Sequence, residues 1–265
     1  MTQRSHRATI WILVAISIVT LTLPTLVVLG ASLTAGNIIQ FPPDGLSLKW
    51  YQKIALASDL RQALWRSVQV SIVCVLVAVP VGTLAGLALS RYRLRFTSAL
   101  QVYLLLPFTI PLIGSGIGMM LTFGSWGILG NLWPVGVACA VINLPFIIWS
   151  VSSSAAALDG DLELAAANCG AGRIETFFHV TLPAVMPGVI TGGLLMFILA
   201  MNEFLVSLLL TDARTVTLPV QIYNSIRSII TPDLAAVSVV FVLIACAAIW
   251  VLDRLVGLEV FLKAK

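Results

Sequence analysis

The chain has 265 residues, of which 59% are hydrophobic and 10% are charged, and its mean hydropathy is +1.04. A water-soluble domain has about 25% charged residues, so this composition excludes a soluble globular protein and indicates one embedded in a membrane. The net charge is +4, but the basic residues lie at the ends of apolar segments and form no stripe, which argues against a nucleic-acid partner.

Six apolar runs are long enough to cross a bilayer, which takes about 20 residues of helix. They cover residues 10–32, 67–90, 98–122, 134–157, 186–211 and 234–256. The first run follows a basic N-terminus, but it is longer than the roughly 7–15 apolar residues of a signal peptide, so we expect a retained span. The sequence therefore predicts an all-α membrane protein with six transmembrane helices, in which residues 1–265 form a single transmembrane domain.

The short connections between the runs predict the orientation. Arg91, Arg93 and Arg95 follow the second run, whereas residues 123–133 carry no charge. The positive-inside rule then places residues 91–97, the polar loop 158–185 and both termini in the cytoplasm. The basic residues of the first outer loop argue weakly against this orientation; they are Lys49, Lys53, Arg61 and Arg66.

The first outer loop contains a short predicted helix. Ser47 is placed to cap a helix over residues 49–54, in which Trp50, Tyr51 and Ile54 share one side. We expect the aromatic rings to lie at the level of the lipid headgroups and to anchor the loop. The alternative is a docking surface for an extracytoplasmic partner.

The third run is the least regular, because Pro107 and Pro111 each remove a backbone donor. Irregular backbone at membrane depth survives only against protein or a water-lined cavity, so the run indicates either a solute pathway or kinked packing. Glycine pairs at four-residue spacing predict close helix contacts; they are Gly82/Gly86, Gly114/Gly118 and Gly188/Gly192. Three cysteines inside apolar runs are expected to be small buried side chains, namely Cys74, Cys139 and Cys246.

Glu203 is an ionisable residue within the fifth run. A carboxylate there is expensive and is by default a functional hypothesis. It either faces a cationic solute or a hydrated vestibule, or it is a structural carboxylate bonded to a neighbouring helix. The sequence has no GxxxxGK[ST] phosphate loop and no HExxH, and its histidines, His6 and His179, lie far apart. We therefore expect neither an enzyme nor a cofactor bound by this chain.

The polar loop 158–185 has the pattern of two short helices separated by Gly170. Asp159 or Asp161 is suited to cap the first helix, and Gly170 is suited to the left-handed position after it. Leu182 and Pro183 are expected to end the second helix. Its apolar residues are expected to pack beneath the bundle; they are Ile174, Phe177, Phe178 and Val180.

This loop resembles the EAA loop of the inner-membrane permeases of ABC transporters. The matching positions are Ala165, Ala166, Gly170, Phe177, Leu182 and Pro183. Leu164 stands where the family has glutamate, and Glu163, one residue earlier, lies about 100° around the helix. The motifs FPPDGLSLKWY, LPFTIP, LPF at 144–146 and Asn202-Glu203-Phe204 are similar to those of permeases for spermidine, putrescine, opines and related solutes.

The resemblance implies a type I ABC importer permease fold in the bacterial inner membrane. It implies four kinds of partner: a second homologous permease in a heterodimer, two cytoplasmic ATPase subunits that bind ATP and Mg²⁺, an extracytoplasmic solute-binding protein, and the lipid bilayer. The solute would be a polyamine or a related cationic or opine compound.

On this resemblance the first helix of the loop couples the permease to an ATPase. The residues expected there are Asp161, Glu163, Leu164, Ala165, Ala166, Gly170, Ala171 and Arg173. The solute is expected to pass Pro107, Pro111, Asn143, Asn202 and Glu203. Two alternatives remain open from the residues themselves: a secondary transporter driven by an ion gradient, and a membrane scaffold or sensor that transports nothing.

Overall fold

The computed structural model describes residues 2–92, 97–228 and 231–256, which are mainly helical and contain no β-strand. The chain divides into two compact units. The first unit consists of residues 1–61 and 222–245, and the second of residues 62–221 and 246–265. The prediction of a single domain stays a prediction, and each unit is described by itself.

The first unit contains α1 (Thr2–Ser32) and α2 (Lys49–Leu56), together with the later half of α11 (Leu218–Ser228) and most of α12 (Pro232–Val256). The spanning part of α1, Ile10–Ser32, agrees with the first predicted run, and its most apolar stretch is not buried within the chain. Such a surface is compatible with lipid or with another membrane subunit.

The loop between α1 and α2 is held by the aromatic residues of α2. Trp50 is buried and its Nε1 donates a hydrogen bond to the carbonyl of Thr34, at 2.9 Å. The hydroxyls of Tyr51 and Ser32 lie 2.7 Å apart, and Ser47 Oγ accepts from the amide of Lys49. The predicted helix and its serine contact are therefore present. The Trp50 ring packs on the loop that it stabilises, and the expectation that the aromatic rings lie at the level of the lipid headgroups stays a prediction.

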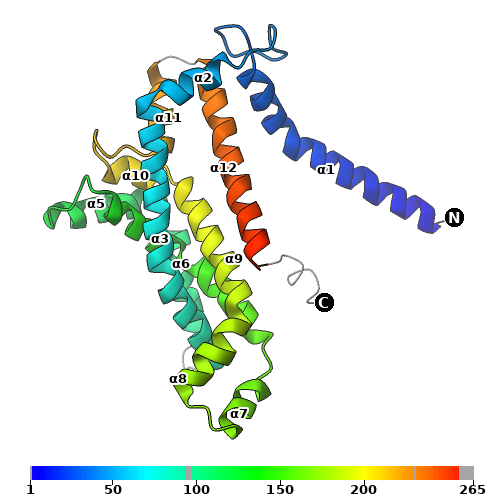
Figure 1. Cartoon of the computed structure of the whole chain (residues 1–265), viewed down its shortest axis with the longest axis vertical. Coiled ribbons are helices and arrows are strands. Elements are labelled where there is room, and N and C mark those ends of the chain that lie inside the picture. Colours follow the sequence, from blue (N-terminus) through cyan, green and yellow to red (C-terminus); the bar gives the residue numbers. More distant parts are fainter. Residues whose placement is uncertain (1, 93–96, 229–230, 257–265) are drawn as a thin grey trace. The chain divides into compact units, whose positions relative to one another are not determined.

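The second unit is built from most of α3 and the helices that follow it. Their bounds are α3 Ser58–Arg91, α4 Thr97–Thr109, α5 Leu112–Ser125, α6 Leu132–Ala156, α7 Asp161–Asn168, α8 Arg173–Thr176, the π-helical η1 Phe177–Thr181, α9 Leu182–Met201 and α10 Leu205–Leu210. Helices α6 and α9 pack along each other, and α5 packs against α10. In Figure 1, α7 and α8 lie at one end of α9, and α10 lies at its other end.

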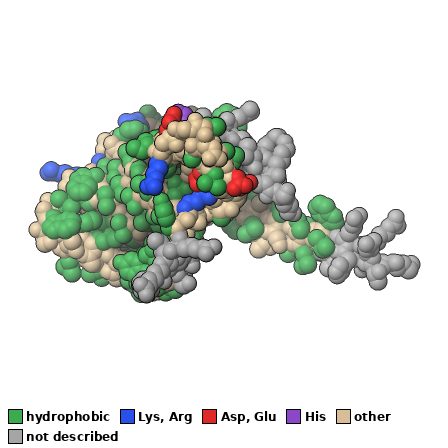
Figure 2. Space-filling view, turned by 90° about the horizontal axis from the view of Figure 1, so that it is seen from below, with side chains coloured by type: hydrophobic (Ala, Val, Ile, Leu, Met, Phe, Trp, Pro, Cys, Tyr) green, Lys and Arg blue, Asp and Glu red, His purple; other side chains and the backbone are tan. Residues whose placement is uncertain are grey.

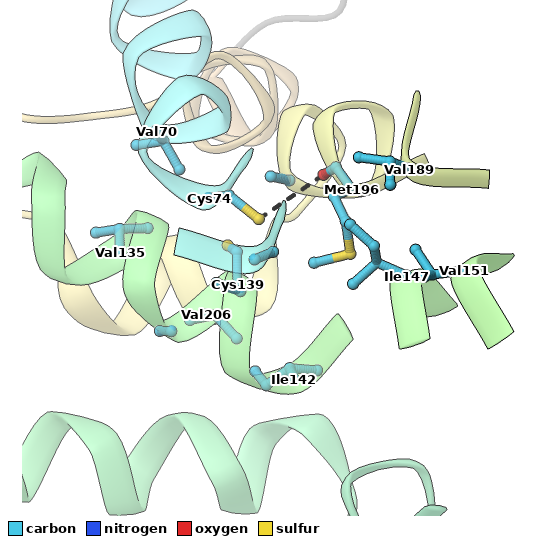
Figure 3. Packing of buried hydrophobic residues seen from close by; sticks show 14 of the residues in the cluster. Val70, Cys74, Val135, Cys139, Ile142, Ile147, Val151, Val189, Met196 and Val206 are labelled. Atoms are coloured by element: carbon cyan, nitrogen blue, oxygen red, sulfur yellow. Dashed lines mark hydrogen bonds between the residues drawn. The ribbon is translucent and has the colours of Figure 1, made fainter. Parts of the chain in front are cut away.

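The core of this unit forms where α3, α6 and α9 meet (Figure 3). Ile147 of α6 is fully buried between Gly82 of α3 and Gly192 of α9, and a Cβ at Gly192 would lie 2.8 Å from its Cγ1. Two of the predicted glycine pairs therefore allow close approach, as expected. The pair Gly114/Gly118 does not, because a Cβ at either meets at most one distant side-chain atom. Cys74 and Cys139 are buried as expected, but Cys246 is exposed.

Four helices are long and apolar enough to cross a membrane, within the described residues: Ile10–Ser32, Ser58–Arg91, Leu132–Ala156 and Arg173–Met201. Shorter apolar helices cover Leu112–Ser125 and Pro232–Ala247. The third predicted run is divided into α4 and α5 at residues 110–111, because Pro111 lacks an amide and restricts the residue before it. The fifth run is likewise divided at residues 202–204.

Pro183 does not end the second helix of the polar loop, contrary to the prediction. Residues Arg173–Met201 form one continuous helix of 29 residues, with a π-helical turn at Phe177–Thr181. Pro183 lies in the first turn of α9, just after this turn. The missing amide of a proline inside a membrane helix is tolerated where the preceding turn adjusts locally, and the π-helical turn at Phe177–Thr181 is such an adjustment.

Candidate functional site

Helix α7 of the polar loop has defined caps at both ends. Asp159 Oδ1 accepts a hydrogen bond from the amide of Asp161, at 3.0 Å. At the other end Gly170 has φ of +91°, and the amide of Ala171 donates to the carbonyl of Ala166 at 3.0 Å. This pattern is a Schellman cap, which favours glycine at the left-handed position. The predicted roles of Asp159 and Gly170 in the helix frame are confirmed.

The side chains of α7 differ in how far they are exposed to solvent. Glu163 and Ala166, three residues apart and so on one face, are half-buried, whereas Leu162 and Leu164 are 51% and 63% exposed. No residue of α7 is fully buried. The Glu163 side chain therefore points toward the bundle, whereas the two leucines, which lie about 100° to either side of it, are exposed.

Glu163 connects α7 to two other helices. Its Oε1 lies 3.2 Å from Nη2 of Arg91 at the end of α3, and the same oxygen accepts a hydrogen bond of 2.7 Å from the hydroxyl of Thr181 in η1. The side chains of Arg91 and Glu163 are 23% and 29% exposed. These three residues line a cavity of about 500 Å³ together with Leu164, Ala171 and Arg173.

The outer surface of the polar loop is partly apolar. Ile174 is 76% exposed and Phe178 is 57% exposed, so the expectation that both pack beneath the bundle is wrong; Phe177 is the residue that packs against the core. Figure 2 views the molecule from this end, where acidic, basic and apolar side chains lie close together. Such a mixed surface is suited to a protein partner.

A second cavity, of about 460 Å³, lies where the two divided runs meet. Four of the five residues predicted to contact the solute line it: Pro107, Pro111, Asn143 and Glu203. Asn202 is not among the lining residues; it is exposed, and its Nδ2 donates to the carbonyl of Ile198 at 2.8 Å. Sequence reasoning missed the apolar wall, which is formed by Ile142, Phe146 and Leu199 among others.

The polar side chains of this second cavity are held by backbone contacts. Glu203 Oε1 accepts from the amide of Val206 at 3.1 Å, which fixes the turn between α9 and α10. Asn143 is buried, and its Nδ2 donates to the carbonyl of Cys139 one turn earlier, at 3.0 Å. Among the described lining residues Glu203 is the charged one.

Comparison with known proteins identifies the family. Residues 78–256 match the family described as binding-protein-dependent transport system inner membrane component. The chain belongs to this family. It is 32% identical over 197 residues to the molybdenum transport system permease protein ModB of Mycobacterium tuberculosis, which covers 69% of this chain and 72% of that protein. It is 26% identical over 212 residues to the spermidine/putrescine transport system permease protein PotC of Haemophilus influenzae, covering 80% and 82%.

The fold agrees with this assignment. The structure is similar to the crystal structure of a bacterial ABC transporter involved in the import of the acidic polysaccharide alginate, with a TM-score of 0.68, 15% identity and coverage of 100% of this chain and 98% of that chain. At this identity the likeness concerns the fold alone.

Family membership decides several of the predictions. The chain is a multi-pass inner-membrane permease of an ABC importer, a transport subunit and not an enzyme. A permease of this kind works with ATPase and binding-protein partners. This decides against the ion-gradient-driven alternative and against a scaffold. The relatives are named for both molybdenum and polyamines, so the family does not fix the substrate.

Sequence reasoning also missed the partners of Glu163. Arg91 was used only to orient the chain, and Thr181 was not considered. The three residues come from separate segments, and the sequence contains no pattern that pairs them.

Proposed function

We propose that this permease pairs with a second homologous permease and moves a polyamine, or a related cationic or opine compound, into the cytoplasm. Two ATPase subunits that bind ATP and Mg²⁺ drive the cycle, and an extracytoplasmic solute-binding protein delivers the solute. The observation that carries the proposal is the cavity at the two helix breaks, where Glu203 is the charged residue among those described.

Electrostatics favours a cation in this cavity. A carboxylate in a region of low dielectric attracts ammonium groups and repels anions. A molybdate-like oxyanion would instead need basic side chains or several convergent amides, and the described lining residues include no lysine, arginine or histidine.

The polar loop is proposed as the contact with one ATPase. Leu162 and Leu164 of α7, and Ile174 and Phe178 later in the same loop, are exposed apolar side chains, and exposed apolar surface is typical of protein interfaces. The contact residues proposed are Asp161, Leu164, Ala165, Ala166, Gly170, Ala171 and Arg173. ATP binding would move α7, and this movement would reach α9, which starts beside Thr181 and ends next to the cavity residue Leu199.

A molybdate-like oxyanion is the second candidate for the transported solute, because ModB of Mycobacterium tuberculosis is 32% identical to this chain. Thermal-shift measurements on the cognate solute-binding protein separate the two. We expect putrescine or spermidine to raise its melting temperature and molybdate to leave it unchanged. The opposite result would replace the polyamine by an oxyanion and would leave the permease assignment intact.

The role of Glu203 is tested by Glu203→Gln. Glutamine keeps an oxygen that accepts from the amide of Val206, so the turn is retained while the charge is lost. A charge-assisted hydrogen bond contributes about 1.5–3 kcal/mol, so uptake of labelled putrescine should fall about tenfold or more. Unchanged putrescine uptake at equal membrane abundance would contradict the assignment.

A further inference from the structure

Among the described residues, helix α7 makes one ion pair with the rest of the permease. It has eight residues, none of them fully buried, and glycine lies on each side of it, at Gly160 and Gly170. A helix this short is marginal in isolation. Of the ion pairs among the described residues, the one that involves α7 joins Glu163 to Arg91.

We propose that Glu163 is a positioning residue of the transport cycle. Through Arg91 and Thr181 it fixes the inner face of α7 to the end of α3 and to the π-helical turn that leads into α9. A displacement of α7 then moves these two helices and is not absorbed by the flanking glycines. This inference rests on the proposed coupling role of the polar loop.

The partial burial of the Glu163–Arg91 ion pair supports this positioning role. Nε and Nη2 of Arg91 are inaccessible to solvent and have no hydrogen-bond partner among the described residues, so the guanidinium depends on its ion pair with Glu163. The two side chains are 23% and 29% exposed, so the ion pair is partly buried, and loss of either partner leaves the other charge partly buried without its counter-charge. The second basic residue at this cavity, Arg173, adds positive charge and further favours a carboxylate at position 163.

Helix α9 connects the contacts of Glu163 to the cavity that contains Glu203. This helix has 20 residues, so at about 1.5 Å per residue it spans about 30 Å. Thr181 immediately precedes it, and Leu199, near its other end, lines the cavity that contains Glu203. One continuous helix therefore joins the residue that contacts Glu163 to the proposed solute pathway. π-helical turns such as the one before α9 occur frequently at functional sites.

The test measures communication between nucleotide and pathway without knowledge of the solute. The exposed cysteines, Cys169 and Cys246, are replaced by serine, and Thr109→Cys places an accessible thiol in the wall of the pathway cavity. The complete complex is reconstituted in lipid nanodiscs, and the rate of maleimide labelling is compared with and without a non-hydrolysable ATP analogue. We expect the analogue to change this rate about fivefold or more in the parent protein.

Three variants test the Glu163–Arg91 ion pair specifically. Complexes that contain Glu163→Gln or Arg91→Gln should still bind the ATPase. In both, the ATP analogue should no longer change the rate of maleimide labelling at Thr109→Cys. The reciprocal exchange Glu163→Arg with Arg91→Glu should restore the response, which a purely structural defect would not do. The matched control is Glu175→Gln, which removes an exposed acidic side chain of the same loop that makes no ion pair in the described residues and should respond like the parent.

The outcomes separate this inference from the proposed function. If Glu163→Gln binds the ATPase and keeps the full response to the nucleotide, the positioning role of Glu163 is refuted while the proposed function stands. The same conclusion follows if the exchange variant stays unresponsive. A parent complex that binds no ATPase, or that shows no response, would overturn the coupling role of the loop, and the positioning role of Glu163 would fall with it.

Discussion

Gly170 allows a test in which backbone conformation is the variable that changes. Its φ is +91°, and a Cβ added there would meet no atom within 4 Å. Gly170→Ala therefore introduces no clash, and its cost is the left-handed backbone of an L-residue, about 1–2 kcal/mol. Because α7 has no fully buried side chain to offset this cost, the ratio of capped to uncapped loop should fall about 5–30-fold.

The matched control lies two residues away. Gly172 also has open space around a Cβ, but its φ is −70°, which any residue adopts. Gly172→Ala should therefore be neutral or slightly stabilising, by about 0.4–1 kcal/mol. Asparagine tolerates the left-handed region better than alanine, so Gly170→Asn should lie between the parent and Gly170→Ala.

The assay is the affinity of the purified ATPase for the permease in nanodiscs. If only the capped loop binds, the apparent Kd rises as the fraction of capped loop falls. We expect a clear weakening for Gly170→Ala and none for Gly172→Ala. Equal affinities for the two alanine variants would refute the reasoning, since these variants differ in the sign of φ.

Three further predictions concern the frame that holds the site. Gly192→Leu should destabilise the permease by about 1–3 kcal/mol, measured as a lower melting temperature in detergent, because its side chain would overlap Ile147. Ser67→Ala should cost about 1–3 kcal/mol in the same assay, because the buried Ser67 Oγ accepts from the amide of Leu218 at 2.8 Å. The hydroxyl of Thr215 and the amide of Arg214 lower the pKa of the Asp212 carboxyl, so limited proteolysis of loop 211–217 should increase as the pH falls below the ordinary value of 3.8.

Controls and contrary outcomes follow from the same contacts. Gly118→Leu has no neighbouring atom within 4 Å of its Cβ and should leave the melting temperature unchanged, as should Ser125→Ala at an exposed hydroxyl. A carboxylate whose folded pKa is depressed stabilises the loop above its unfolded pKa and loses that contribution in acid. Asp212→Asn should therefore remove the pH dependence; a variant cleaved with the same pH profile as the parent would contradict the role of this carboxyl.

The sequence predicted features that depend on local chemistry. Apolar length located four of the six predicted runs as helices long enough to cross a membrane among the described residues, and the Schellman cap followed from Gly170 because few other residues accept its backbone. The irregularity at Pro111 was also predicted. The division into two helices was not, because a proline within a span is compatible with either a kink or a break. Pairing of Glu163 with Arg91 depends on tertiary packing, and nothing in either segment specifies the other.

The face that α7 presents to the bundle contradicts the usual rule for a surface helix. An amphipathic helix normally turns its apolar stripe inward, yet here Glu163 faces inward, while Leu162 and Leu164, about 100° to either side of it, are exposed. Burying one leucine contributes about 1.5–3 kcal/mol, so exposure of Leu162 and Leu164 is unfavourable unless another protein covers them. On the proposed function the ATPase is that protein. The ion pair of Glu163 with Arg91 and the apolar contact of these leucines with the ATPase are then both needed for a movement at the ATPase to reach α9.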